Sequence, residues 1–309
     1  MIVTLTINPA IDRILSVDRL AFEDRAYISS CREAAGGRGI NASCVIHAFG
    51  GRTTAVLVSG GASGKRLEGH LRAYGYPICI VPIRSSVRTN LTVTDRQGLT
   101  VNLNEAGPVL TKPEVARVAR AVHETLSSAS WLLLCGSIPP GVPASFYAEL
   151  IAAARRKEVK TLLHTGGDAL PEGIQAKPTV AMPNQQEAER LLDRALLTRT
   201  QYLEAAERIR SMGAESVILS LGSQGAVAAF ADGIIEATPP RVKAVCPIGA
   251  GDALAAGYTW SIQRKSTVAE ALRWAVAAGT ATARLPGLTF ASLADTQETY
   301  RRVEVRRAE

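Results

Sequence analysis

The sequence predicts an α/β fold of three layers, α/β/α, with a mostly parallel central sheet and a small β-sheet lid. From about residue 111, segments with helical spacing of apolar residues alternate with short apolar segments. This alternation is typical of parallel sheets, because each crossover to the next strand usually contains a helix. Two earlier segments, at about 12–36 and 84–105, are strand-like and half polar, and they predict a discontinuous lid. We expect one domain spanning residues 1–309.

Turn and breaker residues set the expected boundaries of the elements. The first strand, 2–7, ends at Asn8-Pro9, because proline lacks the N–H that a strand ladder needs. Two alternating runs within 89–104, separated by a polar turn, predict a hairpin. Segment 268–283 is apolar but carries charges, which favours a buried helix over a membrane span. The other expected strands are 53–58, 78–82, 131–135, 160–164, 179–182 and 216–220, and the other helices are 40–49, 64–74, 112–127, 143–156, 184–192 and 202–212.

The composition is that of an ordinary globular protein, with 47% hydrophobic and 20% charged residues. The net charge of +7 raises the question of a nucleic-acid partner. However, the arginines are scattered apart from a cluster at 301–307, and no zinc-finger spacing or aromatic RNA-binding signature accompanies them. A solvated surface is therefore favoured, and we expect no nucleic-acid partner.

The cysteines and the start of the chain indicate the compartment. The five cysteines are far apart and form no Cys-x-x-Cys pair, which indicates free thiols in a reducing environment. The first residues show no signal-peptide pattern, and no window of about 20 residues is apolar enough to span a membrane. We therefore expect a cytoplasmic protein without a membrane partner.

The most informative motif is Gly249-Ala250-Gly251-Asp252, a turn of small residues that leads into a helix-forming segment. Such a turn leaves backbone N–H groups unpaired at the positive end of the helix dipole, where an anion can bind. A carboxylate beside an anion site is unfavourable for binding alone, since like charges repel. It is useful if Asp252 takes a proton from a hydroxyl that attacks a phosphoryl group held by the N–H groups of Gly249, Ala250 and Gly251. Simple helix capping by Asp252 is the alternative.

A second glycine-rich turn, 36–39, precedes the expected helix 40–49. Glycines there let the backbone approach a polyhydroxy ligand, and Asn41 offers both a donor and an acceptor. Asp12 follows a strand end, where ligands of parallel sheets bind, and its carboxylate can accept from two sugar hydroxyls. A simple turn residue is the alternative interpretation of Asp12.

Together with the start of the chain, Asn8-Pro9-Ala10-Ile11-Asp12, these two turns resemble those of the ribokinase-like (PfkB) carbohydrate kinase family. Matching blocks run in order from residue 2 to about residue 290. The start is similar to that of the phosphosugar branch, which holds 1-phosphofructokinases, minor-type 6-phosphofructokinases and tagatose-6-phosphate kinases. The resemblance implies a ribokinase-like fold and transfer of the γ-phosphoryl group of ATP to a hydroxyl of a hexose phosphate.

The resemblance also implies which residues hold the sugar. Asp12, Gly37 and Asn41 match the family's sugar-binding positions, and Arg38 stands in place of a common lysine.

A phosphorylated substrate needs further partners for its phosphate. Arg88, at the start of the lid hairpin, resembles the arginine that holds the phosphate in this branch, and Ser137 could donate to the same phosphate. Arg25 is a second basic lid residue in the expected place. A guanidinium suits a phosphate because its fork of donors matches the phosphate oxygens. Solvated lid arginines are the alternative for Arg88 and Arg25.

Two sequence motifs are expected to bind the nucleotide. Ser220, Gly222 and Gly225 match the family's Ser-Leu-Gly-x-x-Gly block, whose small residues let ATP lie along the sheet edge. Asn184 and Glu187 match its Asn-x-x-Glu motif, and Glu187 would act on Mg²⁺ through water, because Mg²⁺ keeps several waters. Asn184 also suits a helix N-cap, which is compatible with a role in binding. ATP and Mg²⁺ are thus the expected cofactors.

Some positions depart from the family's pattern. His164 stands where this branch usually has an aspartate, Met182 stands where a lysine is usual, and Cys246-Pro247-Ile248 precedes the glycine turn in place of a usual Ser/Asn-Thr/Pro-Val. The first two motivate an alternative function, a catalytically weak sensor of sugar phosphates on the same scaffold. A kinase of an unphosphorylated sugar is a further alternative. Because the lid commonly packs on a second subunit's lid in this branch, the resemblance implies a homodimer through the lid.

Overall fold

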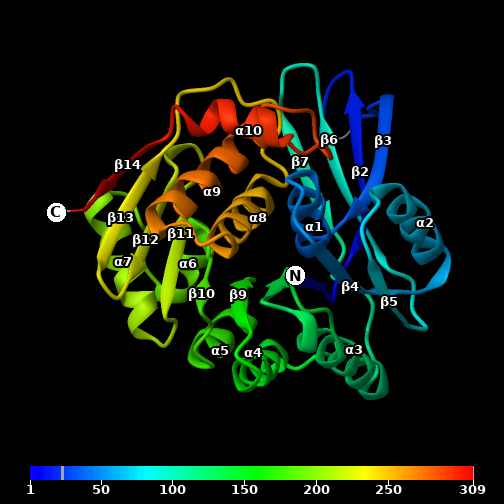
Figure 1. The fold of residues 1–309 in the computed structure, drawn as a ribbon. Coiled ribbons are helices and arrows are strands. Elements are labelled where there is room, and N and C mark those ends of the chain that lie inside the picture. The colour runs from blue at the N-terminus through cyan, green and yellow to red at the C-terminus, as the bar shows by residue number, and fades with distance from the viewer. Residues whose placement is uncertain (22–23, 309) are drawn as a thin grey trace.

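The computed structural model describes residues 1–21 and 24–308, and a ten-stranded sheet forms its centre (Figure 1). The six neighbouring pairs from β11 to β5 are parallel, and the three strands beyond β11 pair antiparallel. In spatial order the strands are β14 (Glu304–Arg307), β13 (Gly233–Thr238), β12 (Ala226–Phe230), β11 (Ser216–Ser220), β10 (Val180–Ala181), β9 (Lys160–His164), β8 (Trp131–Cys135), β1 (Ile2–Thr6), β4 (Thr53–Ser59) and β5 (Ile78–Pro82). The predicted mostly parallel sheet is confirmed.

Helices cover both faces of this sheet, as the three-layer prediction requires. One face packs against α1 (Arg38–Ala48), α8 (Ala250–Gln263) and α9 (Val268–Ala283), with α10 (Leu293–Tyr300) at its side. The other face packs against α3 (Lys112–Thr125), α4 (Phe146–Arg156), α5 (Ala169–Gln175), α6 (Gln185–Leu192) and α7 (Arg199–Ser211). Helix α2 (Gly61–Leu71) closes a third apolar cluster beside the lid, and short 3-10 turns lie at Arg72–Tyr74, Leu126–Ser128 and Gly222–Gln224.

A separate four-stranded sheet forms the lid, which stands to one side of the main sheet (Figure 1). Its strands, in spatial order, are β3 (Ile28–Gly36), β2 (Ala10–Val17), β6 (Arg88–Thr94) and β7 (Thr100–Asn104). Strand β2 follows β1 after the break at Asn8-Pro9, and β3 ends one residue before Gly37, the N-cap of α1. Two of the four connections between the lid and the core are therefore the segments that were predicted from the sequence to bind the sugar.

Several predicted boundaries agree with the structure, and the exceptions have local causes. The strands at 78–82, 131–135, 160–164 and 216–220 and the helix at 268–283 match to the residue. The predicted start of helix 202–212 is wrong, because Thr198 accepts from the N–H of Gln201 and so begins α7 at Arg199. The described helices include none that is long and apolar enough to cross a membrane.

Candidate active site

The site lies where the strand order reverses. After β1 the chain builds β4 and β5 on one side of it and then β8, β9 and β10 on the other. Ligands of open parallel sheets bind in the crevice beyond the carboxyl ends of such strands. Asn8 follows β1, Ser137 follows β8, and His164 is the last residue of β9, so the three side chains belong to this edge.

Asp252 lies in the first turn of α8 and is only 7% exposed. Its Oδ2 accepts a hydrogen bond from Asn41 Nδ2 at 2.8 Å, and its Oδ1 lies 3.2 Å from His164 Nε2. Packing of α1 against α8 brings the first pair together. Asn41 was expected to bind the sugar, whereas here its amide group donates to Asp252. The predicted base is thus held at both carboxylate oxygens.

The turn before α8 has the expected geometry, with one correction. Gly249 has a φ of 80°, and a Cβ there would lie 2.7 Å from Phe290 Cε1, so only glycine fits. The N–H of Ala250 donates to the carbonyl of Pro247 at 3.1 Å, so the prediction that it points outward is wrong. Among the described residues, the N–H groups of Gly251 and Asp252 have no protein acceptor. Of the three N–H groups in the prediction, only that of Ala250 is therefore engaged within the described residues, and that of Asp252 is open in addition.

Asp12 lies in β2, where it accepts a hydrogen bond from Asn90 Nδ2 at 2.8 Å. A Cβ on Gly36 would lie 2.0 Å from Asp12 Oδ2, so this glycine provides the room for the carboxylate. Burial raises the pKa of the Asp12 carboxyl, and the charge of Asp252 adds to this, while Asn90 and Arg88 oppose it. The sequence analysis missed Asn90, although its position two residues after Arg88 puts both side chains on one face of β6.

Arg88 and Asn8 lie where the lid joins the core. Arg88 donates from Nη1 to the carbonyl of Glu105 at 2.9 Å and from Nη2 to the carbonyl of Asn8 at 3.2 Å. Asn8 Nδ2 donates to Ser137 Oγ at 3.1 Å. Asn8 therefore links Arg88 and Ser137, both of which were predicted to bind the substrate phosphate. Burial lowers the pKa of Arg88, an effect that Asp12 opposes.

Arg25, the second predicted phosphate ligand, lies in an exposed segment next to the undescribed residues 22–23. Its backbone N–H donates to Asp24 Oδ1, and no contact joins its side chain to Arg88 or Ser137 within the described part of the chain. The structure therefore brings Arg88 and Ser137 together and leaves Arg25 apart.

Three buried polar atoms around Asp12 have no hydrogen-bond partner in the described residues. They are Asn8 Oδ1, Asn90 Oδ1 and Arg88 Nε. Buried polar atoms are almost always paired in native proteins, so a cluster of unpaired ones requires an explanation. A polar ligand beside Asp12 would supply both the donors and the acceptor that these atoms lack.

A cavity of about 1040 Å³ lies next to the first turn of α8, the turn that contains Asp252. It reaches the start of α8, since Ala250 and Gly251 line it, and the side chain of Arg241 adds a cation to its wall. Met182 is fully buried in the core below α8 and α9. The residues predicted to bind the nucleotide all line this cavity: Asn184, Ser220, Gly222 and Gly225.

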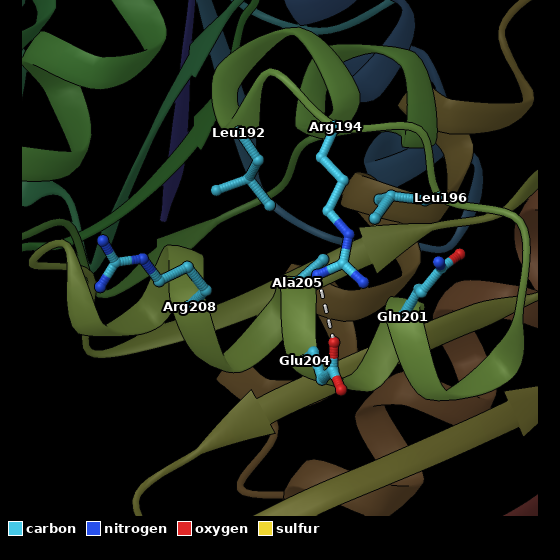
Figure 2. Close-up of a pocket in the computed structure, with 7 residues that line it drawn as sticks. All are labelled: Leu192, Arg194, Leu196, Gln201, Glu204, Ala205 and Arg208. Atoms are coloured by element: carbon cyan, nitrogen blue, oxygen red, sulfur yellow. Dashed lines mark hydrogen bonds and ion pairs between the residues drawn. The ribbon is translucent and has the colours of Figure 1, made fainter.

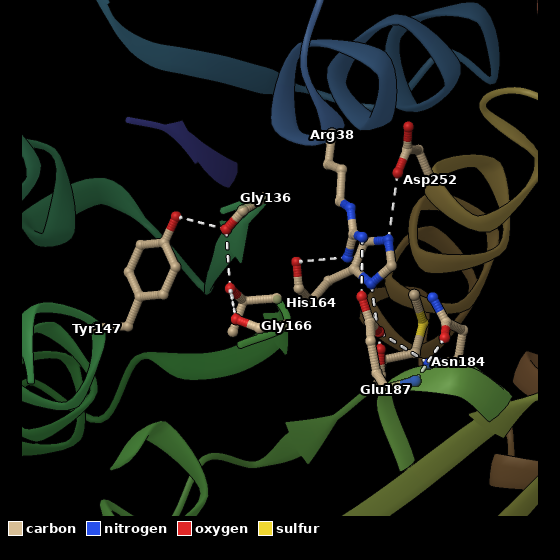
Figure 3. Close-up of polar contacts among 10 residues, drawn as sticks. Arg38, Gly136, Tyr147, His164, Gly166, Asn184, Glu187 and Asp252 are labelled. Carbon is tan, nitrogen blue, oxygen red and sulfur yellow. Dashed lines mark hydrogen bonds and ion pairs between the residues drawn. The ribbon is translucent and has the colours of Figure 1, made fainter. Parts of the chain in front are cut away.

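Glu187 is engaged in a different way from that predicted. Its Oε2 accepts from the N–H of Asn184 at 2.9 Å in a capping box, and its Oε1 accepts from Arg38 Nη2 at 2.8 Å (Figure 3). Arg38 was expected beside the sugar, but its guanidinium points to the nucleotide side. Burial opposes the charge of Arg38, and the charges of Glu187 and Asp252 outweigh it and raise the pKa of Arg38.

A second hollow, of about 350 Å³, lies between α6 and α7 (Figure 2). Arg194 and Glu204 form an ion pair of 3.3 Å across it, and both side chains are more than half exposed. It shares no residue with the groups around Asp252 and contains no arrangement that indicates chemistry.

Comparison with known proteins places the chain in a family. Residues 2–295 match the model of the pfkB family carbohydrate kinases. The chain is 32% identical over 301 residues, 97% of its length and 88% of the relative, to ATP-dependent 6-phosphofructokinase isozyme 2 of Mycobacterium tuberculosis. It is 26% identical over 276 residues, 89% of its length and 87% of the relative, to 1-phosphofructokinase of Vibrio cholerae. The crystal structure of Escherichia coli phosphofructokinase-2 in complex with fructose-6-phosphate has a TM-score of 0.89 at 30% identity and covers 97% of this chain and 98% of that one.

Proposed function

Because the chain belongs to the pfkB family of carbohydrate kinases, we propose that it phosphorylates a hexose phosphate. As a member it is an ATP-dependent carbohydrate kinase, a phosphotransferase with an alcohol group as acceptor. The acceptor in this proposal is fructose 6-phosphate, fructose 1-phosphate or tagatose 6-phosphate. The observation that carries the phosphorylated acceptor is the guanidinium of Arg88, whose Nε is a buried donor without an acceptor among the described residues; the unpaired Oδ1 atoms of Asn8 and Asn90 suit hydroxyl donors.

The proposed reaction is a direct in-line transfer at Asp252. The carboxylate of Asp252 accepts the proton of the sugar hydroxyl, whose oxygen forms a bond to the γ-phosphorus of ATP. The bond from the γ-phosphorus to the β,γ-bridging oxygen breaks, and its electron pair leaves with ADP. The unpaired N–H groups of Gly251 and Asp252, at the positive end of α8, stabilise the charge on the transferred group.

The position of Asp252 supports this assignment. It lies between Asn41, from the helix that follows the lid, and Gly251, which lines the large cavity. A sugar beside Asp12 and a nucleotide in the cavity would meet at this carboxylate. Holding both reactants in this arrangement supplies much of the catalysis of phosphoryl transfer, because positioning removes an entropic barrier.

The residues fit a magnesium ion that arrives with the nucleotide. Among the described residues no group of three or more His, Cys, Asp or Glu side chains is arranged to hold a metal. Mg²⁺ takes few protein ligands when phosphates and water complete its coordination, and it neutralises phosphate charge when bound. Glu187, which follows the cavity-lining residues 184–186 in the chain, would contact it through water, with Arg38 sharing the carboxylate.

In the proposed site Arg88 and Ser137 hold the phosphate that the substrate already carries. Arg88 now donates to two backbone carbonyls, so its guanidinium is oriented before the ligand arrives, and its Nε remains unpaired. An unphosphorylated sugar would bring no anion to this half-buried cation.

Release of ADP from Mg-ATP tests the proposal, with the three phosphosugars, free fructose and ribose as acceptors. We expect turnover on at least one phosphosugar and at least about 100-fold less turnover in Asp252→Asn, the usual scale for a general base. Preference for a free sugar would contradict the phosphate assignment. Tight binding of a phosphosugar without ADP release would instead support a sensor.

We also propose that two lids pack together in a homodimer. Strand β7 is the edge of the lid sheet, and Val101 and Leu103 expose apolar side chains on one of its faces, with Leu103 54% exposed. Apolar side chains on an exposed edge strand favour association with a partner.

A further inference from the structure

His164 is the buried imidazole at the end of β9, and hydrogen-bond acceptors face both of its ring nitrogens (Figure 3). Nδ1 lies 3.1 Å from the carbonyl oxygen of Met182, and Nε2 lies 3.2 Å from Asp252 Oδ1. The residue is 4% exposed, so water cannot readily replace either partner. The catalytic step proposed above makes no use of this contact.

Counting protons shows what this geometry requires. A carbonyl oxygen only accepts hydrogen bonds, so Nδ1 of His164 carries a hydrogen. If Asp252 is ionised, its oxygen also only accepts, and Nε2 carries a second hydrogen, which makes the ring an imidazolium. A neutral ring would require Asp252 itself to carry the proton, and a protonated Asp252 could not accept the proton of the sugar hydroxyl. The proposed base therefore requires the imidazolium form, in which the proton on His164 Nε2 is hydrogen-bonded to the Asp252 carboxylate.

Other charged and titratable groups near the ring leave this pairing in place. Arg38, from α1, donates from Nη1 to the backbone carbonyl of His164 at 3.4 Å, but its charge is matched by Glu187 from α6. Cys135 is the register partner of His164 on β8, and burial raises the pKa of its thiol, which keeps it neutral. Arg38 also interacts with Asp252 through its charge, but among the described residues it is the ring of His164 that lies at hydrogen-bond distance of Asp252 Oδ1.

We propose that His164 is a positioning residue for Asp252, with which it shares a proton. Asn41 holds one carboxylate oxygen and His164 the other, so the carboxylate plane is fixed at both ends. The shared proton also makes the pair neutral overall, which lowers the repulsion between Asp252 and a polyanionic nucleotide at the start of α8. This inference rests on the proposed role of Asp252 as the base.

Two substitutions separate the hydrogen bond from the charge. The amide of His164→Gln reaches the position of Nε2, so it can donate to Asp252 without adding a titrating group. The shorter His164→Asn keeps a donor near Nδ1 for the carbonyl of Met182 and loses the contact with Asp252. Thr161→Val, on the same strand, is the control, because it removes a buried hydroxyl that bonds to Thr179 away from the site.

Steady-state kinetics across pH gives the expected pattern. We expect His164→Asn to lower kcat by about 10- to 100-fold with a sugar KM within a few-fold of the parent, because misplacing a catalytic group acts on turnover. His164→Gln should recover most of kcat, with a pH profile that differs from the parent at the acid side. Thr161→Val should leave kcat and the profile unchanged. Equal kcat in His164→Asn and the parent would overturn the proposal, as would equal losses in the Asn and Gln variants.

A readout without turnover distinguishes this inference from the proposed function. The chain has four histidines, so ¹⁵N resonances of the rings can be assigned by comparing the parent with His164→Gln. We expect a protonated Nδ1 in His164 and a shift of its Nε2 resonance in Asp252→Asn. An unprotonated Nδ1, or no response to Asp252→Asn, would refute the proton-sharing pair even if Asp252 is the base. Normal turnover in Asp252→Asn would refute the base assignment itself.

Discussion

The amide of Asn41 and the carboxylate of Asp252 lie 2.8 Å apart, although 211 positions separate them in the sequence. The first belongs to the helix that follows the lid, and the second begins the helix that borders the nucleotide cavity. This hydrogen bond therefore joins the proposed sugar side directly to the proposed nucleotide side.

Arg88→Ala should weaken binding of the substrate phosphate. Hydrogen bonds to charged groups contribute about 1.5–3 kcal/mol, so we expect the KM for the phosphosugar to rise about 10- to 100-fold, with the ATP KM nearly unchanged. Arg84→Ala is the matched control, since Arg84 is an exposed cation four residues earlier. A similar rise in both variants would show that the effect is general electrostatics and not a specific contact.

Gly36→Ala should impair sugar binding through Asp12. The added Cβ would lie 2.0 Å from Asp12 Oδ2, so the carboxylate must turn away from its present position. We expect a raised sugar KM, measured with the preferred phosphosugar. Gly69→Ala, in α2, introduces the same methyl group where nothing lies within 4 Å, and it should leave kinetics unchanged. An unchanged KM in Gly36→Ala would argue against Asp12 as a sugar ligand.

Arg38 and Glu187 should couple in stability. The ion pair of 2.8 Å is largely buried, and removing one member leaves a charge without its partner. We expect Arg38→Gln to lower the free energy of unfolding by about 1–3 kcal/mol. In the double variant with Glu187→Gln, the loss of unfolding free energy should be smaller than the sum of the losses in the two single variants. Denaturant melts of the four proteins measure this coupling, and additive losses would show that the contact contributes nothing.

Leu103→Lys should disrupt the proposed dimer. A charge placed on the exposed edge strand β7 opposes burial of that face against a second lid. Sedimentation at several concentrations should show a shift from dimer to monomer. Thr100→Lys, on the same strand, changes charge equally without removing an apolar side chain. A parent that is monomeric at all concentrations would contradict the proposed interface.

The layered fold could be predicted because short stretches of the sequence indicate its strands and helices. Alternating apolar segments identified the parallel strands, and the turn at 249–252 indicated a helix that has Asp252 in its first turn, as α8 does. The antiparallel strands β12, β13 and β14 were not predicted, because no α-helix separates β11, β12 and β13 and the alternation of strand and helix therefore gives no sign of them. Strand β14 also depends on its pairing with β13, and this pairing joins segments that are far apart in the sequence.

The site was predicted less completely than the fold, because partner choice depends on distant contacts. The motifs pointed to Asp12, Asp252 and Glu187, whose roles stay predictions. They gave no sign that Asn41 would donate to Asp252, or that Arg38 would pair with Glu187. Both contacts join helices that are more than 140 residues apart in the chain, and only the packed structure shows which partner each side chain finds.

Two of the four connections between lid and core have a thermodynamic consequence. They pass through the proposed sugar site, one at Asn8-Pro9 and the other at Gly36-Gly37. Any hinge movement of the lid there must displace Asp12 relative to α1, so the lid's conformational equilibrium and the sugar's affinity are linked. A partner that holds two lids closed would then tighten sugar binding in both subunits, and the sugar would strengthen that association by the same factor.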